Sequence, residues 1–445
     1  MVAGAERKHA LRVILSSVFS NPDLTEEDRI LARDCEDDFY TFVCNAWPHV
    51  ESETFVEGEH IRQLCIHMQA FSDGEIQNLA MNIPPQHCKS SIVSMMFPAW
   101  EWARAESVLR DCNGPRERYL SFSYREDLAL RDNWRARRLM QTDWYQARWG
   151  GRWHFSTDQN VKSRYVNNLG GQRVAASMCA AVGEGGTRIV LDDPQSYDDA
   201  INRDSRDKVI RFYTGSLSMR GFGLRTRKVL IMQRLSMEDL TGYLQRQTAE
   251  GLEDWTFLIL PIVFSPDRAC ITYRARNERG EWRISNTPPE RWTDVQRFGG
   301  DWRTRPGQPI WPELYGGEAR AIEELEKVRR RTPDDVWAAQ GLQHPVPPGG
   351  ATFKNASWFG LYDYIPAIDT LPARERPIIF TTWDCAIKDK ETNDPTCGWV
   401  IAYYPMLRTY YVLNRVWGRW EFVGQKQQML TQARALARYD ALHIV

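Results

Sequence analysis

The sequence contains no apolar run long enough to cross a membrane, and residues 1–12 lack the apolar core of a signal peptide. Its nine cysteines are odd in number and include no C-x-x-C pair, which argues against a disulfide framework and against a zinc site. We therefore expect an intracellular protein with reduced thiols and no membrane contact. Internal repeats and low-complexity tracts are also missing.

Lysine is scarce: it supplies 10 of the 57 basic residues, and arginine supplies the rest. Arginine suits phosphate contacts and contacts between subunits, but a GC-rich genome would produce the same bias. The formal net charge of −1 does not indicate a nucleic-acid binder, so any DNA-binding surface must come from local clustering. A chain of 445 residues is too long for one core, and we expect two domains with connectors.

The most informative motif is a loop that follows an apolar strand predicted at 79–83. The loop ends in Lys89-Ser90 and leads into a helical run, so backbone N–H groups and a helix N-terminus can face an anion. The lysine would reach terminal phosphates and the serine hydroxyl would bind Mg²⁺. The usual pattern has glycine at both ends, whereas Ile83 and Cys88 stand here, and a plain strand-to-helix turn is the alternative. We expect the nucleotide to contact Gln86, His87, Cys88, Lys89, Ser90 and Ser91.

Two carboxylates end the next informative strand. Residues 187–191 form a short apolar run that stops at Asp192-Asp193-Pro194. A buried parallel strand that delivers an acid at its C-terminal edge is what a Mg-nucleotide site requires. We expect Asp192 to hold Mg²⁺ through water and Asp193 to orient the attacking water. The alternative is that these residues only cap a strand.

A third apolar strand, 228–232, is followed by Gln233. A polar side chain at this strand end, beside two acidic ones, can sense the γ-phosphate, and a plain buried strand is the alternative. The three strands occur in this order and are separated by helical stretches. Together they are typical of a doubly wound P-loop ATPase, and the combination is more specific than any one strand.

With these motifs the chain resembles a known family, the large terminase subunit of tailed bacteriophages. This subunit is the motor and nuclease that packages DNA into capsids. The resemblance covers nearly the whole chain and follows the family's order of motifs. The segments that carry it are 83–90, 97–103, 123–129, 191–194, 232–235, the linker string 345–350, and 383–386.

The resemblance implies an α/β protein in which a P-loop (ASCE-type) ATPase domain precedes the first part of an RNase H-like nuclease domain. Within the connecting region, the charge pattern of residues 318–331 predicts a helix with i,i+4 ion pairs. The expected organisation is an N-terminal helical segment at 1–55, an ATPase core at 56–264, a lid and linker at 265–350, and a C-terminally incomplete nuclease domain at 351–445.

The expected nuclease domain begins with a strand that ends in Asp384. Two further strands, a helix and the start of another strand follow. By resemblance, Asp384 is the first carboxylate of a site for Mg²⁺ or Mn²⁺, and the alternative is a strand-terminal aspartate that faces water. The remaining metal ligands would lie beyond Val445, so we expect either a fragment or a lost nuclease. Three nearby acids, expected to be solvated in a polar turn, are Asp389, Glu391 and Asp394.

Two further roles come from the resemblance alone. His60 stands where the family places a residue near the nucleotide base, and a surface histidine at a helix start is the alternative. Arg137, with Arg138 beside it, would be offered to the nucleotide of a neighbouring subunit. For these arginines the alternative is a solvated basic helix face.

The implied function is an ATP-driven translocase that packages viral double-stranded DNA into procapsids, with ATP and Mg²⁺ as cofactors. Its C-terminal metal-dependent endonuclease would cut concatemeric DNA. The expected partners are double-stranded DNA, the portal protein, a small terminase subunit and further copies of the chain in a ring. The expected location is the host cytoplasm, and transiently the procapsid portal. The alternative is a catalytically inactive prophage remnant that acts at most as a DNA- or portal-binding protein.

Overall fold

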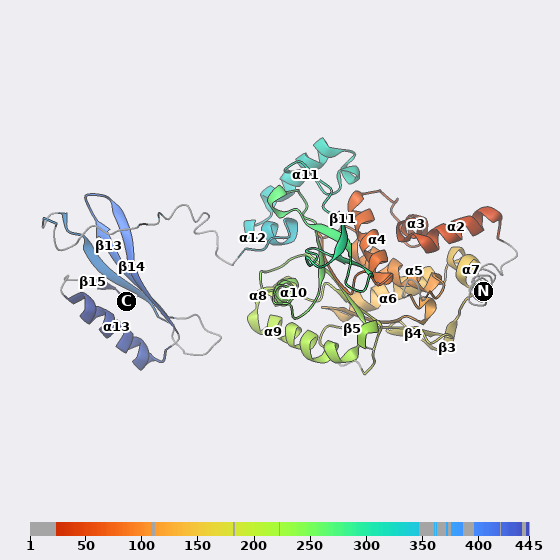
Figure 1. Cartoon of the computed structure of the whole chain (residues 1–445), viewed down its shortest axis with the longest axis horizontal. Helices are drawn as coiled ribbons and strands as arrows, with labels where there is room; N and C mark the ends of the chain where they lie inside the picture. The colour runs from red at the N-terminus through yellow and green to blue at the C-terminus, as the bar shows by residue number, and fades with distance from the viewer. Residues whose placement is uncertain are drawn as a thin grey trace. The chain divides into compact units, whose positions relative to one another are not determined.

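The computed structural model divides the chain into two units, Met1–Gly350 and Ala351–Val445 (Figure 1). The structure describes residues 24–107, 112–180, 183–221, 223–346, 360, 362, 371–372, 375–385, 396–418, 420–437 and 442–444. In this part of the chain, no helix is long and apolar enough to cross a membrane.

The first unit is built on an eight-stranded sheet of order β3-β4-β5-β2-β6-β7-β1-β8. The strands from β5 to β8 in this order are parallel, and β3 and β4 form an antiparallel hairpin at one edge. The bounds are β1 Asn78–Asn82, β2 Arg118–Ser123, β3 Phe155–Asn160, β4 Arg164–Asn167, β5 Gln172–Ser177, β6 Arg188–Asp192, β7 Arg227–Met232 and β8 Thr256–Ile259.

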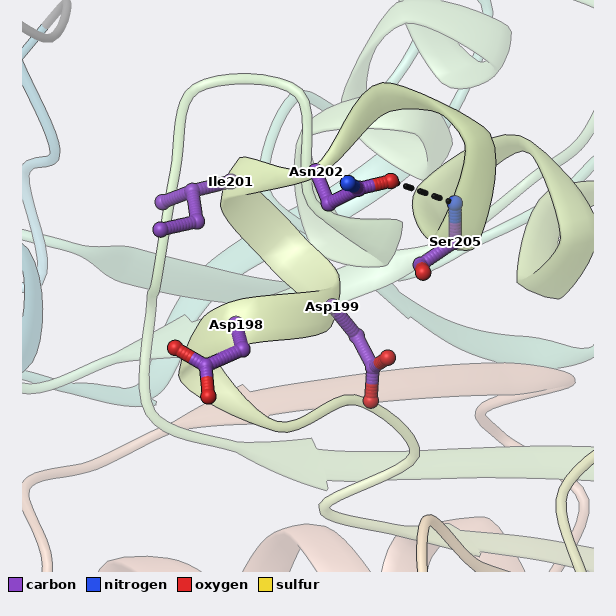
Figure 2. A pocket seen from close by; sticks show the side chains of 5 residues that line it. All are labelled: Asp198, Asp199, Ile201, Asn202 and Ser205. Carbon is purple, nitrogen blue, oxygen red and sulfur yellow. Dashed lines mark hydrogen bonds between the residues drawn. The ribbon is translucent and has the colours of Figure 1, made fainter.

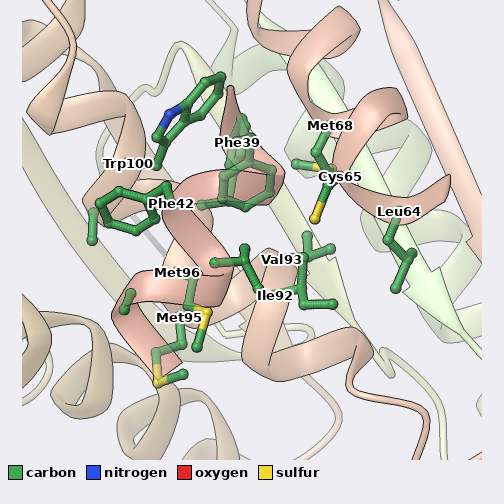
Figure 3. Close-up of a cluster of buried hydrophobic side chains, with 14 of the residues drawn as sticks. Phe39, Phe42, Leu64, Cys65, Met68, Ile92, Val93, Met95, Met96 and Trp100 are labelled. Atoms are coloured by element: carbon green, nitrogen blue, oxygen red, sulfur yellow. The ribbon is translucent and has the colours of Figure 1, made fainter. Parts of the chain in front are cut away.

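Strands β1, β6 and β7 are buried along nearly their whole length because both faces of the sheet are covered, and most of their side chains are apolar. Alternate residues of β1, β6 and β7 belong to two separate hydrophobic cores, as the two-residue period of a strand requires. One core packs against α2 (Glu26–Asp37), α3 (Phe39–Ala46), α4 (Glu59–Ser72), α5 (Phe97–Ala103), α6 (Glu126–Met140) and α7 (Asp143–Trp149), with part of it drawn in Figure 3. The other packs against α8 (Tyr197–Ile201), α9 (Arg203–Arg211) and α10 (Leu240–Ala249).

The strand order is what positions the site. Strand β7 lies between β1 and β6, so an added strand separates the loop strand from the strand that ends in Asp192. This insertion is the mark of the ASCE class, and the predicted α/β fold class is confirmed. Because the strands are parallel, the residues that follow β1, β6 and β7 meet at one edge of the sheet.

Residues 265–346 contain an antiparallel sheet that the sequence analysis does not predict. Its order is β10-β9-β11, with β9 at Ile271–Arg276, β10 at Trp282–Ser285 and β11 at Thr293–Gly300. The charged helix predicted at 318–331 is confirmed as α11 (Glu318–Arg331), where Lys327 pairs with Glu323 at i,i+4. It is followed by α12 (Asp334–Val336) and a π-helical turn, Trp337–Gly341.

The second unit contains a four-stranded sheet of order β14-β13-β12-β15. Strands β12, β13 and β14 are antiparallel neighbours, and β15 returns parallel to β12, which matches the predicted order of three strands, a helix and a further strand. The bounds are β12 Ile378–Asp384, β13 Thr396–Tyr404, β14 Thr409–Gly418, α13 Phe422–Leu436 and β15 Leu442–Ile444. Most of the linker string and the polar turn lie outside the described residues, namely Pro347, Pro348, Gly349, Gly350, Asp389, Glu391 and Asp394.

Candidate functional site

The loop that follows β1 turns sharply at two residues with left-handed backbone. Gln86 has a φ of 62° and Cys88 a φ of 63°. The position where the usual phosphate loop carries glycine therefore does adopt a conformation that favours glycine. For a residue with a side chain, this conformation costs about 1–2 kcal/mol. The loop then enters a helical turn at Lys89 and a π-helical turn, Ser91–Met96.

Lys89 links the three strand ends that the sequence singles out. Its ammonium Nζ lies 2.7 Å from Oε1 of Gln233, which follows β7, and 3.3 Å from Oδ2 of Asp193, which follows β6. The lysine is only 7% exposed. A buried ammonium needs such partners, because desolvation without them is costly. The structure thus brings together a loop cation, a carboxylate and an amide from segments far apart in the sequence.

Ser90 lies beside the other predicted metal ligand. Its hydroxyl Oγ donates to Oδ1 of Asp192 at 2.9 Å, and Oγ of Ser94 donates to Oδ2 of the same carboxylate at 2.6 Å. Ser94 is not among the site residues predicted from the sequence. Its only sequence signal is that it is polar within the apolar run 92–97 and lies four positions after Ser90.

The electrostatics around this carboxylate are unusual. Burial, followed by repulsion from Asp193 and from Asp132, raises the pKa of Asp192 to about 7, while the Ser94 hydroxyl and Lys89 oppose the rise. Burial also raises the pKa of Asp193, and the Lys89 ammonium opposes that rise. A carboxylate with an elevated pKa beside a buried cation is common at functional sites.

Asp132 on α6 is a third acid near this group that the sequence analysis did not single out. It is buried, and the Arg131 guanidinium holds its two oxygens from Nε at 2.9 Å and from Nη2 at 3.1 Å. Among the described residues, no group of three or more histidine, cysteine, aspartate or glutamate side chains is arranged to hold a metal ion. The hydroxyl of Ser90 and the carboxylate of Asp192 are nevertheless the hard oxygen donors that Mg²⁺ takes alongside water and phosphate.

The remaining loop residues point in different directions. The Ser91 hydroxyl donates to Oε1 of Glu51 at 2.8 Å, and the same glutamate pairs with Arg135 of α6. Gln86 is exposed at the turn of the loop. The Nδ1 atom of His87 lies 2.7 Å from the carbonyl oxygen of Pro85, a contact that holds the ring against its own loop.

His60 is fully buried, so the alternative of a surface histidine is wrong. Its ring centroid lies 5.5 Å from that of His87 and 4.7 Å from that of Trp311, a residue the sequence analysis missed. Neither ring nitrogen of His60 has a hydrogen-bond partner among the described residues. Burial lowers the pKa of His60 well below its usual range, and the ring is neutral. His60, which was predicted to lie near the nucleotide base, thus lies against the loop that follows β1.

The structure does not bring Arg137 to the loop group. Its Nη1 donates to the backbone oxygen of Asn160 at 3.0 Å and to the Oδ1 of the same residue at 2.9 Å, at the end of β3. Arg138 is exposed, and its guanidinium carbon lies 5.4 Å from the ring centroid of Trp134. Of the two arginines, Arg138 is the freer to reach another molecule.

Asp384 belongs to the second unit and is exposed at the end of β12. It pairs with Cys397 of β13 in the antiparallel register. The parallel register of β12 with β15 runs from Phe380 opposite Leu442 to Thr382 opposite Ile444.

A hollow of about 570 Å³ lies on α8 and the start of α9 (Figure 2). Within it, Oδ1 of Asn202 accepts a hydrogen bond from the backbone N–H of Ser205 at 3.0 Å, which caps α9. None of the predicted site residues lines this hollow. Its lining residues are Asp198, Asp199, Ile201, Asn202 and Ser205.

No protein-family model matches the sequence, and no curated protein matches it. Similar solved structures include the large terminase of a thermophilic bacteriophage in complex with ADP, at 8% identity and a TM-score of 0.36, covering 86% of this chain and 74% of that one. The same terminase with ATP-γ-S has 8% identity and a TM-score of 0.33, covering 85% and 72%. At these values the site must be interpreted from its own geometry.

Proposed function

We propose that the chain hydrolyses ATP at the edge where β1, β6 and β7 end, and that it uses this energy to move double-stranded DNA. The observation that supports this most is the position of the Lys89 ammonium between Gln233 and Asp193, beside a serine-bound Asp192. A cation, a metal-ligand pair, an acid and an amide at one sheet edge are the parts that phosphoryl transfer needs.

Each side chain has a role in this proposal. Lys89 holds the terminal phosphates, and Ser90 with Asp192 holds Mg²⁺, which when bound neutralises charge on the phosphates. Asp193 orients the attacking water and accepts its proton. Gln233 exchanges its bond to the lysine for contact with the γ-phosphate, and thereby reports whether this phosphate is present. The buried His60, whose two ring nitrogens have no hydrogen-bond partner in the described part of the chain, would face the base.

The wider role we propose is packaging of a viral genome into a procapsid. It is supported by the order of motifs along the sequence and by the resemblance drawn from them. The proposed partners are the portal protein, a small terminase subunit and neighbouring copies that offer an arginine of α6, and the proposed location is the host cytoplasm. The second unit would cut DNA with Mg²⁺ or Mn²⁺ held in part by Asp384.

The test is steady-state ATP hydrolysis by the purified chain with Mg²⁺, with and without double-stranded DNA. We expect DNA-stimulated turnover that is lost in Lys89→Ala and kept in the control Lys327→Ala, which removes an exposed lysine of α11. Binding without turnover would indicate that a partner subunit supplies the arginine. Neither binding nor turnover would reject the motor and favour an inactive remnant.

A further inference from the structure

The backbone N–H of the residue after Gln233 is bound by a side chain near the C-terminal end of the first unit. Oε1 of Gln343 accepts a hydrogen bond at 2.9 Å from the backbone N–H of Arg234. Gln343 is 3% exposed, and its Nε2 donates to the carbonyl oxygen of Gln340. The amide is therefore used at both ends and is fixed in place.

The turn after β7 is otherwise organised by Asp239. Its carboxylate accepts from the backbone N–H of Leu235 at 2.8 Å and of Ser236 at 3.3 Å. It also binds Nε of Arg234 at 3.0 Å. Asp239 thus orders the turn from within, whereas Gln343 reaches the first residue of the turn from 109 positions away.

The segment that carries Gln343 is anchored independently. The backbone N–H of Ile262 donates to the carbonyl oxygen of Gly341 at 2.8 Å. The hydroxyl of Tyr197, on the helix that follows Asp192-Asp193, donates to Oδ2 of Asp335 at 3.3 Å. This segment therefore contacts the chain beyond both β6 and β7, the two strands that end in proposed site residues.

We propose that Gln343 is a positioning residue of the nucleotide site. It fixes the backbone of Arg234, and this directs the adjacent Gln233 side chain toward Lys89. The inference rests on the proposed ATPase function, because Gln233 has a catalytic role only there. A displacement of about 1 Å in a positioned group can lower a rate about a hundredfold, so one remote hydrogen bond is enough to matter.

The test compares Gln343→Met, which keeps the volume but removes the acceptor, with Gln63→Met. Gln63 is a matched control, since it is also buried and its Oε1 accepts from a backbone N–H, that of Gly300, at 3.0 Å. We expect kcat for ATP to fall about ten- to a hundredfold in Gln343→Met only, with the Kd for ADP changed less than about threefold. Hydrogen exchange at the Arg234 amide should accelerate in the same variant, because this N–H loses its acceptor.

A double variant separates positioning from a merely structural effect. If Gln343 acts through Gln233, then Gln343→Met should lower kcat little further in a Gln233→Met background. Equal kcat values for Gln343→Met and Gln63→Met would overturn the inference while wild-type turnover leaves the proposed function standing. A wild-type chain that neither binds nor hydrolyses ATP would reject both. Should Gln343→Met fail to fold, Gln343→Asn replaces it, since asparagine shortens the reach of the amide by one methylene. The same measurements of kcat, of the Kd for ADP and of hydrogen exchange then test the inference.

Discussion

The ammonium of Lys89 lies 2.7 Å from the side-chain oxygen of Gln233, although the two residues are 144 positions apart in the sequence. A second bond, to Asp193, completes its surroundings at 3.3 Å. A nucleotide that binds here has to replace these contacts with contacts to phosphate. The lysine therefore connects nucleotide binding at its loop to the residues that follow β6 and β7.

Replacement of Gln233 by methionine should lower kcat more than it weakens nucleotide binding. The methionine keeps the volume but cannot accept from Lys89 or contact the γ-phosphate, whereas Asp193 still holds the ammonium. We expect a loss of about ten- to a hundredfold in kcat and less than about tenfold in the Kd for ADP. Steady-state turnover and ADP titration measure both, and a Kd that rises as much as kcat falls would contradict the role of Gln233 as a sensor.

Cys88 should tolerate glycine and reject valine. Its φ of 63° is open to glycine without strain, whereas a β-branched residue there is a genuine outlier. We expect Cys88→Gly to keep ADP binding and Cys88→Val to lose it, with a melting temperature lower by several degrees. The control is Cys44→Val, at a half-buried cysteine within α3. Unimpaired binding by Cys88→Val would show that the loop does not need this conformation.

Stability and metal binding should depend on pH through Asp192. Burial and the neighbouring Asp193 raise its pKa from 3.8 to about 7, so the folded state binds a proton more tightly than the unfolded chain does. The stability of the nucleotide-free protein should therefore fall as the pH rises from 3.8 to about 7, and change little above that. Affinity for Mg-ADP should rise over the upper part of this range, by up to about tenfold per pH unit, because Mg²⁺ needs the carboxylate.

The comparison for this pH effect is Asp192→Asn, which cannot titrate. Chemical denaturation and Mg-ADP binding should both be measured between about pH 5 and about pH 8. Titration of the nucleotide itself affects the two proteins alike, so only the difference between them reports on Asp192. Parallel pH profiles would show that this carboxyl does not control binding.

A buried ion-pair network at the opposite end of the central strands, where β2 and β6 begin, should be essential for stability. Nη2 of Arg188, at the start of β6, lies 2.9 Å from Oε1 of Glu101 and 2.8 Å from Oε1 of Glu117. All three side chains are at most 1% exposed. Arg188→Met leaves two buried carboxylates without their cation, and we expect a loss of about 3–5 kcal/mol in the free energy of unfolding.

The matched control for this network is Arg246→Met, which breaks an exposed pair with Glu238 at 3.0 Å. Surface pairs contribute at most about 1 kcal/mol. Urea denaturation of both variants gives the comparison. Similar losses of unfolding free energy in the two variants would mean that the buried pairs of Arg188 contribute no more to stability than an exposed pair does.

Much of the α/β fold could be predicted because strands buried on both faces consist mostly of apolar residues, as in 79–83 and 228–232. The acids that end β6 were also visible, since a proline stops the strand directly after them. The β9–β11 sheet was missed because its strands are not runs of buried apolar residues: β9 and β10 are mostly half-buried, and Thr293–Gln296 of β11 are all exposed.

The sequence by itself determined which strands are buried, where they end, and which polar side chains follow them, because these features depend on residues close together in the chain. Only the tertiary structure decided that β7 lies between β1 and β6, and so that Lys89 meets Gln233. It also decided the burial of His60 and the contacts of Ser94 and Gln343. These depend on parallel strands and distant segments that pack against each other, and such pairings leave no local pattern in the sequence.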